Sequence, residues 1–128
     1  MEACVAKTFY DNGIAFRQEV YSSEFPSLTV LGTDEKRFDF CIETQRRKYL
    51  IEVNFYSSGG SKLNEVARSY TDLAPKINSV SEFEFVWVTD GIGWQSARNK
   101  LEEAYNTIPY VFNLASLPMF IEQIKEES

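Results

Sequence analysis

The sequence predicts a single α/β domain over residues 1–128, built on a mixed sheet with helices on both faces. Three observations support this. Residues 37–56 alternate apolar and polar side chains like a hairpin, 83–89 are almost continuously apolar like a central strand, and several segments repeat apolar residues at helical spacing. A chain of 128 residues with 44% hydrophobic content can form one domain with a proper core but not two of ordinary size.

Local signals indicate where these elements end. Gly13 can adopt the left-handed conformation that closes a helix, and Pro75 and Pro109 are expected to stop helices because proline has no N–H. Ser61 and Ser116 precede apolar helical repeats and are candidate N-caps. The expected order is a helix over 2–12, strands over 14–21, 37–43 and 48–56, a helix over 61–74, a strand over 83–89, a helix over 94–108, a strand over 110–114, and a last helix after Ser116 that frays at its end.

The hairpin carries the candidate functional residues. Side chains alternate between the faces of a strand, so Asp39 is expected opposite the face taken by Phe38, Phe40 and Ile42. In the second strand, Glu52 and Asn54 share a face.

The register of the hairpin decides whether the two acids meet. If Gln45 and Arg46 form its centre, Asp39 lies directly across from Glu52, with Cβ atoms about 4.5–5.5 Å apart. Like charges in that position are destabilising alone, and a divalent cation that prefers carboxylate oxygens would stabilise them. Glu2 on the first helix could face this pair, although a solvated position is expected for it.

Composition excludes several classes of function. The chain contains no histidine, which removes His-dependent triads, His-ligated zinc and histidine general bases. Its net charge of −6 is opposite in sign to that of a typical nucleic-acid binder, yet seven of the 13 basic residues lie between 36 and 68. The two cysteines, Cys4 and Cys41, are interpreted as small buried hydrophobes. No secretion signal or membrane span is recognised, which indicates a cytoplasmic location without a membrane partner.

A glycine-containing loop over 57–61 leads into the helix that begins at Ser61. The amides and positive dipole end of that helix would suit a phosphate, while Lys62, Asn64 and Arg68 lie on its polar face. These polar residues would be merely solvated in an ordinary helix, and nearby acids make contact with a substrate the alternative. The G-x-x-x-x-G-K-[ST] spacing is absent, so no nucleotide cofactor is expected.

The order of elements, with an acid in one hairpin strand and a second acid in the next, resembles the αβββαβ core of the PD-(D/E)XK nuclease superfamily. The wording "RFDF…YLIEVNFYSSGGSKLNEVARSY…FVWVTDGIGW" closely resembles the catalytic part of the DpnII/MboI family of type II restriction endonucleases, over roughly residues 36–114. Members of that family are considerably longer, so the similarity is to their C-terminal part.

The resemblance implies a restriction-endonuclease-like fold and Mg²⁺-dependent hydrolysis of double-stranded DNA at GATC palindromes by a homodimer. Asp39 matches the motif aspartate, Glu52 the second acid, and Asn54 the position where the superfamily most often has lysine. Because asparagine carries no positive charge, either Lys62 replaces that lysine or metal and phosphate act unaided.

In the expected mechanism, Asp39, Glu52 and the Val53 carbonyl hold one or two Mg²⁺ ions that activate water. Lys62 and the helix amides from Ser61 onward clamp a phosphate oxygen, while Asn64 and Arg68 reach base edges.

Three alternatives remain open at this point. The chain could be a binding module of the same fold without useful chemistry, a nuclease for branched or single-stranded DNA, or an unrelated mixed domain in which both acids are solvated residues of edge strands.

Overall fold

A computed structural model describes residues 2–28, 31, 35–56, 61–91 and 98–128, without the side chains of 61, 62 and 98–100. The predicted order of helices and strands is confirmed. The elements are α1 (Glu2–Asp11), β1 (Arg17–Tyr21), the short 3₁₀ helix η1 (Ser22–Glu24), β2 (Arg37–Glu43), β3 (Lys48–Phe55), α2 (Ser61–Asn78), β4 (Phe83–Asp90), α3 (Arg98–Thr107), β5 (Tyr110–Phe112) and α4 (Leu117–Glu127).

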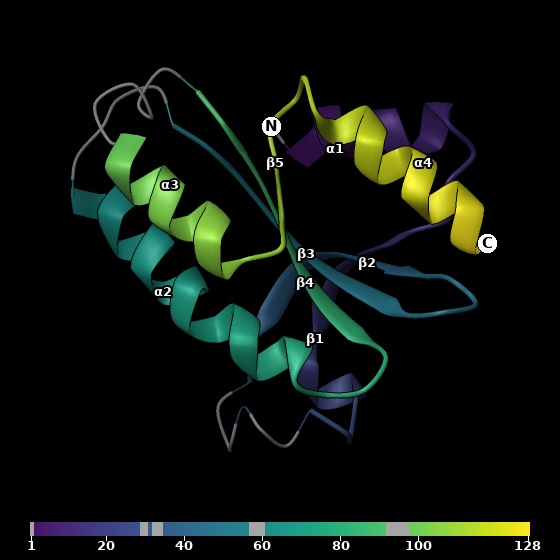
Figure 1. Cartoon of the computed structure of the whole chain (residues 1–128). Helices are drawn as coiled ribbons and strands as arrows, with labels where there is room; N and C mark the ends of the chain where they lie inside the picture. The colour runs from purple at the N-terminus through teal and green to yellow at the C-terminus, as the bar shows by residue number, and fades with distance from the viewer. Residues whose placement is uncertain (1, 29–30, 32–34, 57–60, 92–97) are drawn as a thin grey trace.

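The five strands form one mixed sheet in the order β1-β2-β3-β4-β5, in which β1, β2 and β3 are antiparallel and β4 and β5 continue in parallel. Figure 1 shows α2 and α3 side by side on one face of the sheet, with α1 and α4 on the other. This is the predicted α/β architecture and is compatible with a restriction-endonuclease-like fold. Because β2 and β3 lie inside the sheet, the hairpin is buried on both faces.

Each face of the sheet has its own apolar core. The core under α2 and α3 contains Leu50, Phe85 and Trp87 together with Leu63, Ala67 and Ile77 from α2. The core under α1 and α4 contains Tyr49, Ile51 and Val86 together with Phe9 and Phe120. Alternate residues of β3 therefore point into different cores, as strand geometry requires.

The predicted register of the hairpin is confirmed. Phe40 pairs with Ile51 and Glu43 with Lys48, and the Thr44 N–H donates to the Arg47 carbonyl to close the turn. The paired numbers sum to 91, as they do for a turn centred on Gln45 and Arg46 (40 + 51 and 43 + 48).

The predicted faces of β2 are partly wrong. Phe40 and Ile42 share a core, but Phe38 lies in the opposite one with Val20 of β1. The regular pairing of β1 with β2 is interrupted at Glu19 and Asp39, and Glu19 has φ of 53°, in the left-handed region. The regular alternation of β2 is therefore lost at Asp39, and Phe38 before it packs in the other core from Phe40 after it.

Two predicted helix ends are also wrong. α2 continues past Pro75 to Asn78, because Ala74 and Ile77 extend its apolar stripe into the core and packing outweighs the missing N–H. The end of α4 does not fray into solvent, since Glu127 is only 7% exposed and bonds to the Tyr49 hydroxyl.

Smaller differences concern single residues. Cys41 is buried as predicted and burial raises the pKa of its thiol to about 11, but Cys4 is exposed. On α3, Tyr105 is 47% exposed, whereas Ala104 and Ile108 are buried. None of the helices within the described ranges is long and apolar enough to span a bilayer.

Candidate active site

The two predicted acids are buried where β2 and β3 separate. Asp39 is 6% exposed and Glu52 is 5% exposed. The Val53 N–H donates to Asp39 Oδ2 at 2.8 Å, so the aspartate side chain takes a main-chain donor of the neighbouring strand. This bond fixes the carboxylate beside Glu52. Burial inside the sheet rules out the interpretation of both residues as solvated acids on edge strands.

Burial is the main influence on the pKa of Glu52. It raises the pKa of the carboxyl from 4.5 to about 7, against the opposing effect of Lys36, and the charge of Asp39 raises it further. Two carboxylates in one desolvated place repel each other. The arrangement therefore favours a bound proton or a cation.

A lysine that the sequence analysis did not single out lies against the pair. Lys36 Nζ is 2.6 Å from Glu52 Oε1. The ammonium also lies 5.6 Å from the centre of the Phe38 ring and 5.7 Å from that of Tyr70. Lys36 directly precedes β2, outside the regular ladder.

Asn54, which stands where the superfamily most often has lysine, is engaged in a partly buried network. Its Nδ2 donates to the Tyr70 hydroxyl at 3.1 Å, and its Oδ1 accepts the Trp87 indole N–H at 2.6 Å. Both amide atoms thus join β3 to α2 and β4. Asn54 and Glu52 share a face of β3, as predicted.

Glu2 adds a third carboxylate at the edge of this site. It is exposed, as expected for a residue at the start of α1. Partial burial and the neighbouring Asp39 nevertheless raise the pKa of its carboxyl. Glu2 therefore lies near the buried pair, where additional negative charge would attract a cation.

The residues predicted on α2 are only partly described. The side chains of Ser61 and Lys62 lie outside the described residues, although the helix does begin at Ser61. Asn64 Oδ1 is buried and has no hydrogen-bond partner within the described parts of the chain. Arg68 is exposed and lines a shallow depression with Thr71 and Glu103. Tyr70, two positions further along and on another side of the helix, contacts the acid site through Asn54 and Lys36.

The donor set fits Mg²⁺, a hard cation that takes oxygen ligands and keeps several waters. The available oxygens are those of the two buried carboxylates, and the Val53 carbonyl is the third predicted ligand. Across the described ranges, no group of three or more Asp, Glu, Cys or His side chains is arranged to hold a metal. The protein would therefore supply few ligands and water the rest.

Sequence reasoning found Asp39, Glu52 and Asn54 but missed the contacts of Lys36 and Tyr70. Extending the hairpin register places Lys36 opposite position 55, not Glu52. The long side chain of Lys36, which directly precedes β2, nevertheless reaches Glu52. Tyr70 lies on the apolar side of α2, and its hydroxyl also reaches Asn54.

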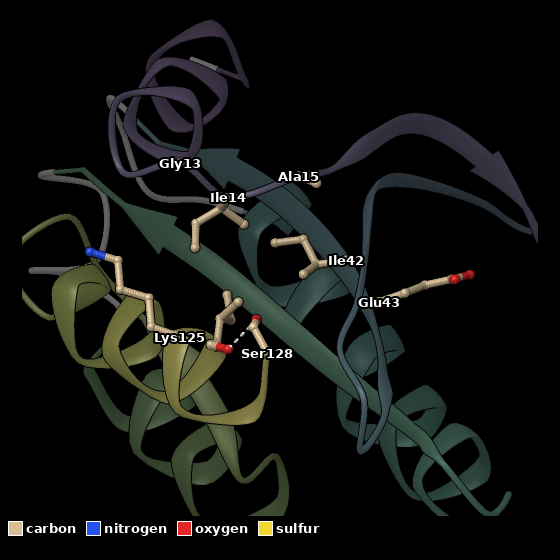
Figure 2. A pocket seen from close by; sticks show the side chains of 8 residues that line it. Gly13, Ile14, Ala15, Ile42, Glu43, Lys125 and Ser128 are labelled. Atoms are coloured by element: carbon tan, nitrogen blue, oxygen red, sulfur yellow. Dashed lines mark hydrogen bonds between the residues drawn. The ribbon is translucent and has the colours of Figure 1, made fainter.

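A separate pocket lies away from the acids. Figure 2 shows it between the segment Gly13–Ala15, the end of β2 and the end of α4, with Ile14 and Ile42 on its floor. Glu43 and Lys125 direct their charged ends in opposite directions there. Without converging polar groups, this pocket is a poor candidate for chemistry.

Together the fold and the site define a class of protein: a mixed sheet covered on both faces, with a buried Asp-Glu pair on a central hairpin, typical of nucleases of the restriction-endonuclease type. The model of the DpnII restriction endonuclease family matches residues 1–123, more of the chain than the predicted 36–114. The chain belongs to the DpnII restriction endonuclease family.

Curated relatives agree with this assignment. The chain is 54% identical over 127 residues to the type II restriction enzyme MboI of Moraxella bovis, which covers 99% of this chain and 45% of that protein. It is 45% identical over 100 residues to the type II restriction enzyme DpnII of Streptococcus pneumoniae, covering 78% of this chain and 35% of that protein. The chain thus spans less than half the length of these relatives. No solved structure matches it.

Proposed function

We propose that this chain is a nuclease domain of a type II restriction endonuclease that hydrolyses phosphodiesters of double-stranded DNA at GATC palindromes with Mg²⁺. The observation that carries the proposal is the buried Asp39–Glu52 pair inside the sheet of a chain that belongs to this family. The buried carboxylates leave few uses other than holding a cation, since no histidine is available for another kind of hydrolysis.

In the proposed reaction, a water oxygen bonds to phosphorus, one phosphodiester P–O bond breaks, and the leaving oxygen takes up a proton. Asp39, Glu52 and the Val53 carbonyl would hold Mg²⁺, which lowers the pKa of water and neutralises phosphate charge when bound. The Val53 N–H keeps Asp39 in place throughout. Asn54 acts through the network that joins β3 to α2 and β4.

The start of α2 is proposed to face the DNA backbone. Ser61 and Lys62 would hold a nonbridging phosphate oxygen, helped by the amides of the first helical turn. Asn64 and Arg68 are proposed to contact base edges, where asparagine suits adenine and arginine guanine. A homodimer and a cytoplasmic location complete the proposal and rest on the family alone.

A cleavage assay tests the proposal. The purified chain is incubated with a GATC duplex and Mg²⁺ beside Asp39→Ala and Glu52→Ala, with a GTAC duplex of otherwise identical sequence as the control substrate. Cleavage of the GATC duplex alone, lost in both variants, is expected. Equal cleavage of both duplexes would contradict the specificity, and cleavage by either variant would contradict the assigned acids. Branched and single-stranded substrates in the same assay test that alternative.

A binding module without chemistry is the second candidate. The net charge of −6 and the coverage of only 45% of the MboI length favour it, because an acidic chain attracts DNA weakly and more than half of MboI lies outside the matched part. It predicts DNA association without cleavage at any Mg²⁺ concentration. Fluorescence anisotropy measures association with the same duplex, and the cleavage assay shows whether cleavage accompanies it. Association without cleavage separates the binding module from the enzyme.

A further inference from the structure

Lys36 is held in place more firmly than a surface lysine. Its N–H donates to Ser22 Oγ at 2.9 Å, and its carbonyl accepts the Ser22 N–H at 2.8 Å. Ser22 itself is only 6% exposed. The main chain of Lys36 is therefore fixed on both sides before its side chain makes any contact.

The side chain leads to the acids along aromatic surface. The rings of Phe38 and Tyr70 line its ammonium, and Glu52 Oε1 accepts from Nζ at 2.6 Å. The lysine side chain is 34% exposed, whereas that of Glu52 is 7% exposed. One end of this ion pair is buried and the other is open to an approaching molecule.

Asn54, at the position where the superfamily most often has lysine, is connected to Lys36 through Tyr70. Asn54 holds the Tyr70 hydroxyl, and the Tyr70 ring lies beside the Lys36 ammonium. Asn54 thus holds Tyr70, and Tyr70 in turn packs against the ammonium of Lys36.

We propose that Lys36 is the catalytic cation of this site, supplying from the entrance of β2 the positive charge that Asn54 lacks. The inference rests on the proposed nuclease function. An ammonium has three N–H donors, of which one meets Glu52, so others remain for an oxygen of the scissile phosphate. Lys36 forms and breaks no covalent bond. Its charge stabilises the negative charge that develops on phosphate during attack.

A competing explanation is that Lys36 merely fills the place of the missing cation and leaves when Mg²⁺ binds. The two explanations agree about Mg²⁺ affinity, because removing a competing charge strengthens binding of the ion in either case. They disagree about cleavage, which falls only if Lys36 acts on the phosphate.

The test uses Lys36→Met, with Lys48→Met as a matched control on the far end of β3. Lys48 is 32% exposed, pairs with Glu82 at 3.9 Å and lies 5.5 Å from the Phe83 ring centre, so it loses similar contacts. Single-turnover cleavage of a GATC duplex and calorimetric titration of DNA-free protein with Mg²⁺ are measured for each protein. Lys36→Arg tests whether charge alone restores activity.

In Lys36→Met, cleavage is expected to fall about 100-fold or more, while Mg²⁺ affinity stays equal or rises on the order of 10-fold. Lys48→Met is expected to match the wild type, and Lys36→Arg to keep more activity than Lys36→Met. Unchanged cleavage in Lys36→Met, or loss of its Mg²⁺ binding, would overturn the proposal while the nuclease function stands. If the wild-type chain cuts no DNA, the nuclease function fails and the role of Lys36 with it.

Discussion

A buried glutamate side chain lies near each end of β3, and the two glutamates have different surroundings. At the turn end, Glu127 of α4 accepts from the Tyr49 hydroxyl at 2.8 and 2.9 Å and from Thr44 Oγ1 at 3.0 Å, with Arg47 Nε 3.5 Å away. At the other end, Lys36 is the one ion-pair partner that Glu52 has among the described residues, and Asp39 lies beside it.

This difference separates a structural carboxylate from a functional one. Several donors surround Glu127, so its charge is satisfied by the fold, and the bonds attach the last helix to the hairpin. Within the described residues, fewer donors surround Glu52 than Glu127, and the neighbouring Asp39 adds negative charge. A group that the fold itself leaves poorly compensated is suited to bind something else.

The largest expected effect tests this division directly. Glu52→Gln is expected to lower cleavage on the order of 10³-fold, because the amide cannot supply a charged oxygen to a cation. Glu127→Gln removes the same charge at the other end of β3 and is expected to leave cleavage within about twofold of wild type. Single-turnover rates on a GATC duplex compare the two variants. Equal losses would remove the distinction between the two ends.

The free energy of unfolding is expected to respond in the opposite way to cleavage, with the larger loss at Glu127. Glu127→Ala removes the acceptor for Tyr49 and Thr44 and should lower the free energy of unfolding by about 3 kcal/mol. Glu52→Gln should leave it unchanged or raise it by up to about 1–3 kcal/mol, since the buried charge it removes is poorly compensated. Urea denaturation at pH 7 without divalent ions measures both. A larger loss in Glu52→Gln would assign Glu52 a structural role.

The pH dependence of stability should also reveal Glu52. Its pKa is raised from 4.5 to about 7, so between these values the folded protein keeps a proton that the unfolded chain has released. The free energy of unfolding therefore falls as the pH rises through this window, by about 1–3 kcal/mol. Below pH 4.5 the Glu52 carboxyl is protonated in both the folded and the unfolded protein, so its contribution to the free energy of unfolding is fully present.

Comparison of wild type with Glu52→Gln isolates this effect. Denaturation in metal-free buffer at several pH values from 4 to 8 should give a flatter curve for the variant than for wild type. Parallel curves would show that Glu52 titrates near its ordinary pKa despite its burial.

The sheet and its acids were predictable because they depend on local periodicity. The alternation of β3 places Glu52 and Asn54 on one face, and the four-residue turn sets the register that brings Asp39 toward Glu52. These features follow from residues close together in the sequence. The burial of both acids followed once the hairpin was placed inside the sheet.

The cation at the site was not predictable in this way. Lys36 directly precedes β2, where Ser22 fixes its main chain, and its side chain reaches Glu52 instead of position 55. Nothing in the periodicity of β2 predicts this contact. Tyr49 and Thr44, which donate to Glu127, lie more than 70 residues away in the sequence, so its burial depended on tertiary packing that no local pattern contains.

The smallest expected effect concerns the lysine that Asn54 replaces. Asn54→Lys restores the superfamily residue, yet it removes the acceptor of the Trp87 indole and the donor to Tyr70. If Lys36 is the catalytic cation, cleavage should not rise, and the free energy of unfolding should fall by about 1–2 kcal/mol. Gln18→Lys, which adds the same charge on the exposed edge strand β1, serves as the control. A faster enzyme after Asn54→Lys would mean that the site lacks a cation and that Lys36 does not supply it.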